Sequence, residues 1–271
     1  MDSTSPYRCA LITGASSGLG VQFARQLAPV CRVMILVARR VDLLDQLATE
    51  LAMASPEVRI YCFKADLTKN EDVDLLFNSM QSLLLVPDLL INNAGMGDYG
   101  EFASSDWSKV NDMMQLNMVA LTRLAHQYLP GMIANGAGDI LNVSSLASCL
   151  PIPDFAVYAA TKAYVTSFSE ALRIELREHG VNVLALCPGP VHTGFGAIAH
   201  RAEAGNVTPG GEFVYVSAQQ VVAEGLAAMR RGKARHYPAA KMALIAAVIG
   251  LLPMAAVRLV MSRRPRRSAS L

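Results

Sequence analysis

The sequence predicts a single α/β domain, and three observations point to that class. The chain has 271 residues, which suits one domain with a sizeable buried core. Short apolar runs typical of buried strands recur along it, and several are followed by helical patterns. The first run, Cys9 to Thr13, leads directly into a glycine-rich turn and then into apolar residues at helical spacing. Strand, turn and helix in this order indicate an α/β architecture.

Composition divides the chain into an acidic body and a basic, apolar tail. Hydrophobic residues make up 52% of the chain and the mean hydropathy is +0.31, which is high for a soluble enzyme. All 22 acidic residues precede Arg230, against 14 basic residues in the same part. From Arg230 onward there are ten basic residues and no acidic one. This asymmetry predicts a tail that meets an anionic surface.

The remaining composition excludes several classes of protein. Five cysteines without metal-ligand spacing predict reduced, mostly buried thiols and no metal site; they are Cys9, Cys31, Cys62, Cys149 and Cys187. The N-terminal residues before the first strand contain no apolar signal segment. We therefore expect a cytoplasmic body, with peripheral contact to the cytoplasmic membrane face through the tail, and no nucleic-acid partner.

The glycine-rich turn after the first strand has the context of a phosphate site. Between a strand and a helix, backbone N–H groups and the helix N-terminus can hold a pyrophosphate. An ordinary strand-to-helix turn is the alternative, but the glycine spacing favours cofactor binding. The expected contacts are Gly14, Ser16, Ser17, Gly18, Leu19 and Gly20.

The second apolar run, Val33 to Val37, ends in Ala38-Arg39-Arg40. In dinucleotide-binding folds an acid at this point selects NAD, whereas a nearby arginine accommodates the 2′-phosphate of NADP. Ala38 takes the place of the acid, so the sequence favours NADP(H), with Arg39 on the phosphate. Arg40 is expected to begin a solvated helix.

A serine, a tyrosine and a lysine in the middle of the chain form a chemically sensible set. A helix over Ala156 to Glu170 would place Tyr158 and Lys162 one turn apart on one face. A phenol titrates near 10, and an adjacent cation favours the phenolate that a proton donor at neutral pH must approach. Ser145 follows the apolar run Ile140 to Val143, where its hydroxyl could hold a carbonyl oxygen.

Five signatures together resemble the short-chain dehydrogenase/reductase family. They occur in the family's order over roughly residues 8 to 195: the turn Gly14 to Gly20, Asn92-Asn93-Ala94-Gly95, Asn117, the Ser145/Tyr158/Lys162 set, and Pro188 to Thr193. The resemblance implies a Rossmann-like, doubly wound parallel sheet of about seven strands with helices on both faces. It implies an NADP-binding and catalytic domain over residues 1–239, to which the tail of residues 240–271 is appended.

The resemblance also implies roles for single residues near the cofactor. Asn93, Ala94 and Gly95 let the ribose approach the backbone, and Tyr158 and Lys162 also contact the cofactor. Asp66 and Leu67, after the apolar run Val58 to Lys64, would lie beside the adenine, although Asp66 could instead cap a helix that starts near Lys69. The nicotinamide contacts implied are Pro188, Gly189, Val191 and Thr193.

For catalysis, the resemblance implies that Tyr158 transfers a proton, Ser145 holds the substrate oxygen and Lys162 binds ribose and lowers the pKa of Tyr158. Asn117 would distort its helix and hold a relay water. Pro151, Pro153 and the stretch from Gly194 to Pro209 are expected to line or cover the substrate site.

The function so implied is NADP(H)-dependent interconversion of a carbonyl and a secondary alcohol. The preferred substrate class is a lipophilic ketone such as a 3-oxoacyl or steroid-like compound. Alternatives are a small hydroxy acid as substrate and a non-catalytic NADPH-binding regulator. We expect a homo-oligomer, a dimer or a tetramer.

The tail contains an uncharged stretch, Met242 to Val257, and then Arg258 and Arg263-Arg264-Pro265-Arg266-Arg267. Sixteen helical residues span about 24 Å, less than the roughly 30 Å hydrocarbon core, and Pro253 would interrupt a straight helix. A helix in the membrane interface is therefore expected over residues 241–267. The alternatives are that the tail folds over its own substrate site or against a second subunit.

Overall fold

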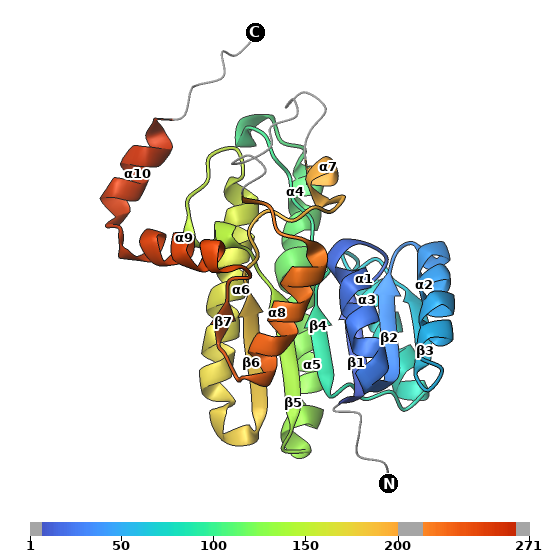
Figure 1. Cartoon of the computed structure of the whole chain (residues 1–271). Coiled ribbons are helices and arrows are strands. Elements are labelled where there is room, and N and C mark those ends of the chain that lie inside the picture. The colour runs from blue at the N-terminus through green and yellow to red at the C-terminus, as the bar shows by residue number, and fades with distance from the viewer. Residues whose placement is uncertain (1–6, 200–213, 264–271) are drawn as a thin grey trace.

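The computed structural model describes residues 7–199 and 214–263, and within them the chain forms one seven-stranded sheet (Figure 1). The strands lie in the order β3-β2-β1-β4-β5-β6-β7, and every neighbouring pair is parallel. Their bounds are β1 (Tyr7–Thr13), β2 (Cys31–Ala38), β3 (Arg59–Lys64), β4 (Leu89–Asn92), β5 (Gly138–Val143), β6 (Val181–Leu186) and β7 (Arg235–His236). The predicted fold class is thereby confirmed.

Helices cover both faces of the sheet. They are α1 (Gly18–Leu27), α2 (Val41–Ala54), α3 (Asn70–Ser82), α4 (Trp107–Met114), α5 (Leu121–Ala134), α6 (Ala156–Glu175), α7 (Phe195–Ala199), α8 (Ala218–Arg230), α9 (Ala240–Leu251) and α10 (Met254–Ser262). Shorter turns include the π-helical segment η3 (Gln115–Ala120) and the 3-10 turn η4 (Leu146–Cys149). Helices α1, α2 and α8 pack on one face, and α3, α5 and α6 on the other.

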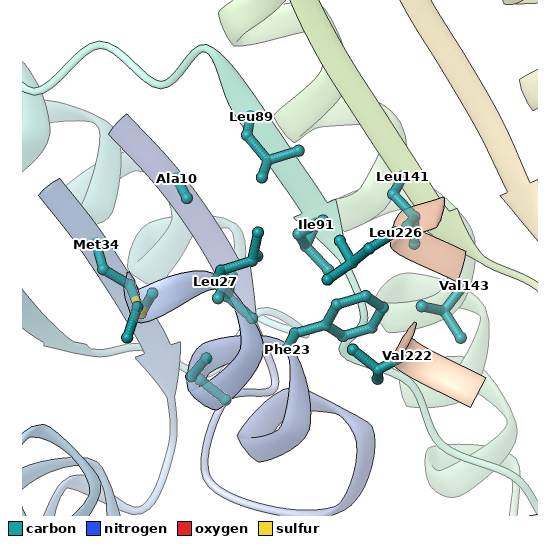
Figure 2. Close-up of a cluster of buried hydrophobic side chains, with 14 of the residues drawn as sticks. Ala10, Phe23, Leu27, Met34, Leu89, Ile91, Leu141, Val143, Val222 and Leu226 are labelled. Atoms are coloured by element: carbon teal, nitrogen blue, oxygen red, sulfur yellow. The ribbon is translucent and has the colours of Figure 1, made fainter. Parts of the chain in front are cut away.

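The core follows from side-chain alternation along the strands. In β1, Ala10 and Ile12 point to the face of α1 and α8, whereas Cys9 and Leu11 point to the opposite face. Figure 2 shows the first face, where Phe23 of α1 packs near Val222 of α8. Because both faces are covered, the central strands β1, β2, β4, β5 and β6 are mostly apolar, as in other parallel sheets.

The strand order reverses between β1 and β4, so the connections that follow them diverge to opposite sides. In open α/β sheets ligands bind outside the carboxyl ends of the strands at this switch point. The glycine turn follows β1 and the Asn92 to Gly95 segment follows β4, so both expected cofactor segments lie there.

The structure tests the sequence expectations at two further places, the stretch after β6 and the tail. In the stretch Gly194 to Pro209, which was expected to line or cover the substrate site, Phe195–Ala199 forms the short helix α7, and residues 200–209 lie outside the described residues. In the tail, the chain leaves helix α9 at Leu252 and Pro253 and starts α10, as the proline predicts.

Candidate active site

The turn after β1, residues 14–20, encloses a space that side chains at its glycines would fill, and we call it the glycine cradle. A Cβ on Gly20 would overlap the carbonyl oxygen of Gly14, and a Cβ on Gly14 would lie 2.9 Å from Cα of Ala94. Gly14 and Gly18 both have positive φ, 65° and 57°, which glycine adopts at little cost. The turn ends at the N-terminus of α1, whose free N–H groups attract phosphate. These residues fit a dinucleotide pyrophosphate.

Asn93 and Thr13 hold the two cofactor segments together. The Nδ2 of Asn93 donates to the carbonyl oxygens of Thr13 and Gly14, at 2.9 and 3.2 Å. The Oγ1 of Thr13 accepts from the backbone N–H groups of Asn93 and Ala94, each at 3.0 Å. The turn after β1 and the segment after β4 therefore form one hydrogen-bonded unit.

The catalytic set meets where β5 and α6 come together. Ser145 follows β5 and caps η4, where its Oγ accepts from the N–H of Ala147 at 3.1 Å. Tyr158 and Lys162 are both buried on α6, and Nζ of Lys162 lies 5.7 Å from the centroid of the Tyr158 ring. The same ammonium donates to the carbonyl oxygen of Val143 at 2.8 Å.

The electrostatics of this set differ in one respect from the sequence expectation. Burial raises the pKa of Tyr158 to about 12, and a hydrogen bond from Ser145 opposes that shift. Burial also lowers the pKa of Lys162, to about 8. The net shift of the Tyr158 pKa is therefore upward, and the lowering effect of Lys162 stays a prediction.

Asn117 lies inside η3, a π-helical segment between α4 and α5. Its Oδ1 accepts from the N–H of Met96 at 3.0 Å, and its Nδ2 donates to the carbonyl oxygen of Met96 and to Oγ1 of Thr161, at 2.9 and 3.0 Å. A Cβ on Gly95 would lie 3.2 Å from Oδ1 of Asn117 and 3.4 Å from Nζ of Lys162. The asparagine distorts its helix, as expected, and lies beside the lysine.

The turn after β6 joins the catalytic and cofactor segments. The N–H of Leu146 donates to the carbonyl oxygen of Pro188 at 2.8 Å. At the other end of the turn, a Cβ on Gly18 would lie 3.3 Å from the methyl of Thr193. Val191 forms an isolated bridge with Val216. Pro188 to Thr193 thus runs from the catalytic serine to the glycine cradle.

A comparison with family models decides the identity of this arrangement. Residues 8–203, which include all the described site residues, match the model of the short chain dehydrogenases. The chain belongs to the short-chain dehydrogenase family.

Curated relatives and solved structures agree with this family. A ketoacyl reductase HetN from Nostoc sp. is 33% identical over 189 residues, 70% of this chain and 65% of that protein. A very-long-chain 3-oxoacyl-CoA reductase from Phaeosphaeria nodorum is 35% identical over 179 residues, 64% of this chain and 52% of that protein. The matched part of the chain spans between about half and two thirds of these relatives.

Among solved structures, a short-chain dehydrogenase from Sphingobium yanoikuyae in complex with NADPH matches with a TM-score of 0.77 and 29% sequence identity. The match covers 97% of this chain and 98% of that one. The likeness therefore extends into the tail as well as over the sheet.

In this short-chain dehydrogenase, an arginine after β2 makes a hydrogen bond to the glycine turn that the sequence did not predict. Arg39 is exposed, as its expected role requires. Arg40 is exposed at the start of α2, as we expected, and it also donates from Nη2 to Oγ of Ser16 in the glycine turn, at 3.1 Å. Nothing in the local sequence predicts which of two adjacent arginines turns back toward the cradle.

Asp66 does not cap the helix that follows it. Its Oδ1 accepts from the N–H and Oγ1 of Thr68, at 3.2 and 2.8 Å, while α3 starts at Asn70 without a side-chain cap. The helix-cap alternative is therefore wrong. The adenine contact of Asp66 and of buried Leu67 stays a prediction.

Aromatic residues form an apolar wall around Tyr158. The ring of Phe155 stacks on Tyr158 with centroids 4.2 Å apart, and Phe195 of α7 lies 5.6 Å away. Met96 and Ile152 pack against the same cluster. Phe155 precedes Tyr158 by three residues, a helical spacing that could have been noticed, whereas the approach of Phe195 depends on the tertiary fold. Pro151 and Pro153, expected to line the substrate site, flank Ile152 in this cluster.

Lys162 should make stability depend on pH in a defined direction. Its pKa is about 8 when folded against 10.5 in a model compound. Below pH 8 both states bind the proton, and burying the charge destabilises the fold by a constant amount. As pH rises from 8 to 10.5, the unfolded chain binds more protons than the folded protein, so stability increases, by roughly 3 kcal/mol in total.

The measurement is urea unfolding from pH 7 to 10 of the wild type and Lys162→Met, which keeps an apolar stem without the charge. We expect the free energy of unfolding of the wild type to rise relative to the variant over this range. Tyr158 is present in both proteins and cancels from the difference. A difference that stays constant with pH would contradict the lowered pKa.

Proposed function

We propose that this chain is an NADP(H)-dependent oxidoreductase that interconverts a carbonyl and a secondary alcohol. The observation that carries the proposal is the convergence of Ser145, Tyr158, Lys162 and Asn117 beside the glycine cradle, at the carboxyl ends of the strands. A protein that only bound NADPH would need the cradle but not these four side chains. For that reason a non-catalytic regulator is the weaker hypothesis.

The glycine turn after β1 would hold NADPH, which when bound would supply the hydride for the carbonyl carbon. Tyr158 donates its proton to the carbonyl oxygen as negative charge develops there, and the hydrogen bond from Ser145 opposes the rise in its pKa that burial causes. Ser145 donates a hydrogen bond that aligns the oxygen and stabilises its charge. Lys162 binds the nicotinamide ribose, and Asn117 connects the lysine to solvent. In the reverse direction the same groups accept the proton of an alcohol.

We propose a lipophilic ketone, such as a 3-oxoacyl or steroid-like compound, as the substrate class. Phe155 and Phe195 lie against the Tyr158 ring, and Met96 and Ile152 pack against the same cluster. The groups next to the carbonyl would therefore meet apolar surface. The names of the two curated relatives, both reductases of ketoacyl compounds, support the same class. A small hydroxy acid would leave this apolar wall unused.

The experiment is NADPH consumption by the purified full-length protein in mild detergent. The panel runs from small hydroxy-acid precursors to long-chain 3-oxoacyl thioesters and ketosteroids. Turnover that rises with the hydrophobicity of the ketone supports the proposal. Turnover confined to small polar substrates would reject the substrate class while keeping the reaction, and the absence of any turnover with NADPH bound would favour the regulator.

The preference for NADPH should depend on the two arginines after β2. Arg39→Asp and Arg40→Asp should each lower the ratio of kcat/KM for NADPH to that for NADH, because each removes a cation from the 2′-phosphate and adds a repelling carboxylate. Charge-assisted hydrogen bonds of this kind predict a drop of roughly 10- to 100-fold. Arg59→Asp is the matched control, since Arg59 is exposed at the amino end of β3, far along the strand from the cradle. Unchanged ratios in both test variants would refute the NADPH assignment.

The expected homo-oligomer stays a prediction. Members of the family assemble through helices that flank the catalytic one, and here Val119 and Tyr164 are part of an open hollow of about 630 Å³ along α5 and α6. Light scattering of the purified protein gives the molar mass in solution.

A further inference from the structure

Helix α9 is apolar on two opposite faces. Met242 and Ala246 are buried against the body, with Ile245 beside them. Leu244, Val248 and Leu251 follow one another at spacings of four and three residues, so they form a stripe on the other side. Leu251 is 85% exposed and Leu244 66%. A surface helix of a soluble protein presents polar residues outward, so the outward stripe of α9 fits an apolar environment.

The exposed apolar surface continues beyond the end of α9. Leu252 and Met254 lie at the bend, and Leu259 and Val260 lie on α10, all of them exposed. Figure 1 shows α9 crossing the edge of the body and α10 extending away from it. We call α9, the bend and α10, residues 240–263, the C-terminal arm. Isolated exposed apolar residues are ordinary, but a continuous set of this size marks a site of interaction.

The shape of the arm suits the surface of a bilayer better than a crossing. Within the described residues no single helix is long and apolar enough to span a membrane, whereas α9 and α10 pass that test only together. They are bent by 111° at the break. Their 12 and 9 residues correspond to about 18 and 14 Å of helix, well short of the roughly 30 Å hydrocarbon core.

The charges of the arm select an anionic partner. Arg258 and Arg263 are exposed at its outer end, and the sequence contains no acidic residue after Glu224. A second arm would offer these arginines no carboxylate, so pairing of two copies arm against arm would gain no ion pair. Anionic headgroups instead attract arginine while the acyl region accepts the leucines.

We propose that the C-terminal arm docks on the surface of an anionic lipid bilayer, with α9 and α10 lying in the interface. The first residues of the arm, in α9, pack against the end of the sheet that carries the catalytic residues. Met242 packs so closely on Gly189 that a Cβ there would overlap its sulfur, and α9 packs against η4, which follows the catalytic serine. Docking therefore turns this end of the sheet toward the lipid. The inference concerns the arm and stands independently of the proposed reaction.

The test is flotation of the full-length protein with vesicles of phosphatidylcholine alone or mixed with phosphatidylglycerol. We expect the protein to float with the mixed vesicles. Leu251→Glu and Leu259→Glu should each lower the partition coefficient roughly tenfold or more, since each removes a leucine that would be buried in the bilayer. Met53→Glu and Ile174→Glu are matched controls, because these apolar residues are 75% and 76% exposed on α2 and α6. Both controls should float like the wild type.

A second pair of variants tests the electrostatic part. Arg258→Gln with Arg263→Gln should weaken flotation with phosphatidylglycerol vesicles several-fold, and Arg177→Gln, an exposed arginine outside the arm, should not. Thermal unfolding of each variant checks that the fold is intact. The proposal is overturned if the wild type does not float with anionic vesicles, or if arm and control variants float alike. It is also overturned if Leu251→Glu lowers the molar mass by light scattering without changing flotation, because the arm would then join two copies.

Discussion

Tyr158→Phe should lower the rate of carbonyl reduction by roughly 10²- to 10⁴-fold while NADPH still binds. The substitution removes the hydroxyl that donates the proton and keeps the ring that stacks on Phe155 at 4.2 Å. Ser145 loses its hydrogen-bond partner, but no side chain of the glycine cradle is disturbed. The measurement is steady-state turnover beside a fluorescence titration with NADPH.

The matched control is Tyr164→Phe on the same helix. Tyr164 is 39% exposed and its hydroxyl is hydrogen-bonded to Thr122 at 2.9 Å, away from Ser145. This variant should turn over like the wild type. If Tyr158→Phe kept its activity, or lost NADPH binding in parallel with turnover, the role of proton donor would be misassigned.

Gly20→Ala should abolish measurable NADPH binding and lower stability. The added Cβ would overlap the carbonyl oxygen of Gly14 and lie 2.8 Å from Cα of Ala15, so the cradle must open. Neither contact is the flexible end of a side chain, and overpacking of this kind costs about 1 to 3 kcal/mol. The measurements are urea unfolding and titration with NADPH.

Gly136→Ala separates backbone strain from loss of the cradle. Gly136 has a φ of 61°, close to those of Gly14 and Gly18, but a Cβ there meets nothing within 4 Å. It should cost about 1 to 2 kcal/mol of stability and leave NADPH affinity unchanged. NADPH affinity of Gly20→Ala equal to that of the wild type would mean that the turn after β1 does not form the cofactor site.

The sheet was readable from the sequence because its strands are short apolar runs bounded by turn residues. The predicted run Val33 to Val37 lies within β2, and helix α6 starts at the predicted Ala156. β7 escaped prediction because it has only two residues, Arg235 and His236, neither of which forms an apolar pattern. Its pairing with β6 depends on contacts from a distant part of the chain.

At the site, residues whose roles depend on local sequence were predictable, and those whose roles depend on burial were not. The spacing of Tyr158 and Lys162 places them on one face, but only the surrounding core shows that both are buried and that their pKa values move toward 12 and 8. The contacts of Arg40 with Ser16 and of Phe195 with Tyr158 join elements that are separate in sequence. Such contacts have no periodic signal.

The most direct test of the proposed reaction is the fate of the hydrogen on C4 of NADPH. The full-length protein is incubated with a 3-oxoacyl thioester or ketosteroid and NADPH deuterated at C4, in separate reactions for each of the two C4 positions. Mass spectrometry of the product should find deuterium on the new carbinol carbon from one of the two labelled forms, and no labelled product with Tyr158→Phe over the same time. Product that forms without deuterium from either form, or label transfer at the wild-type rate in Tyr158→Phe, would contradict carbonyl reduction at this site.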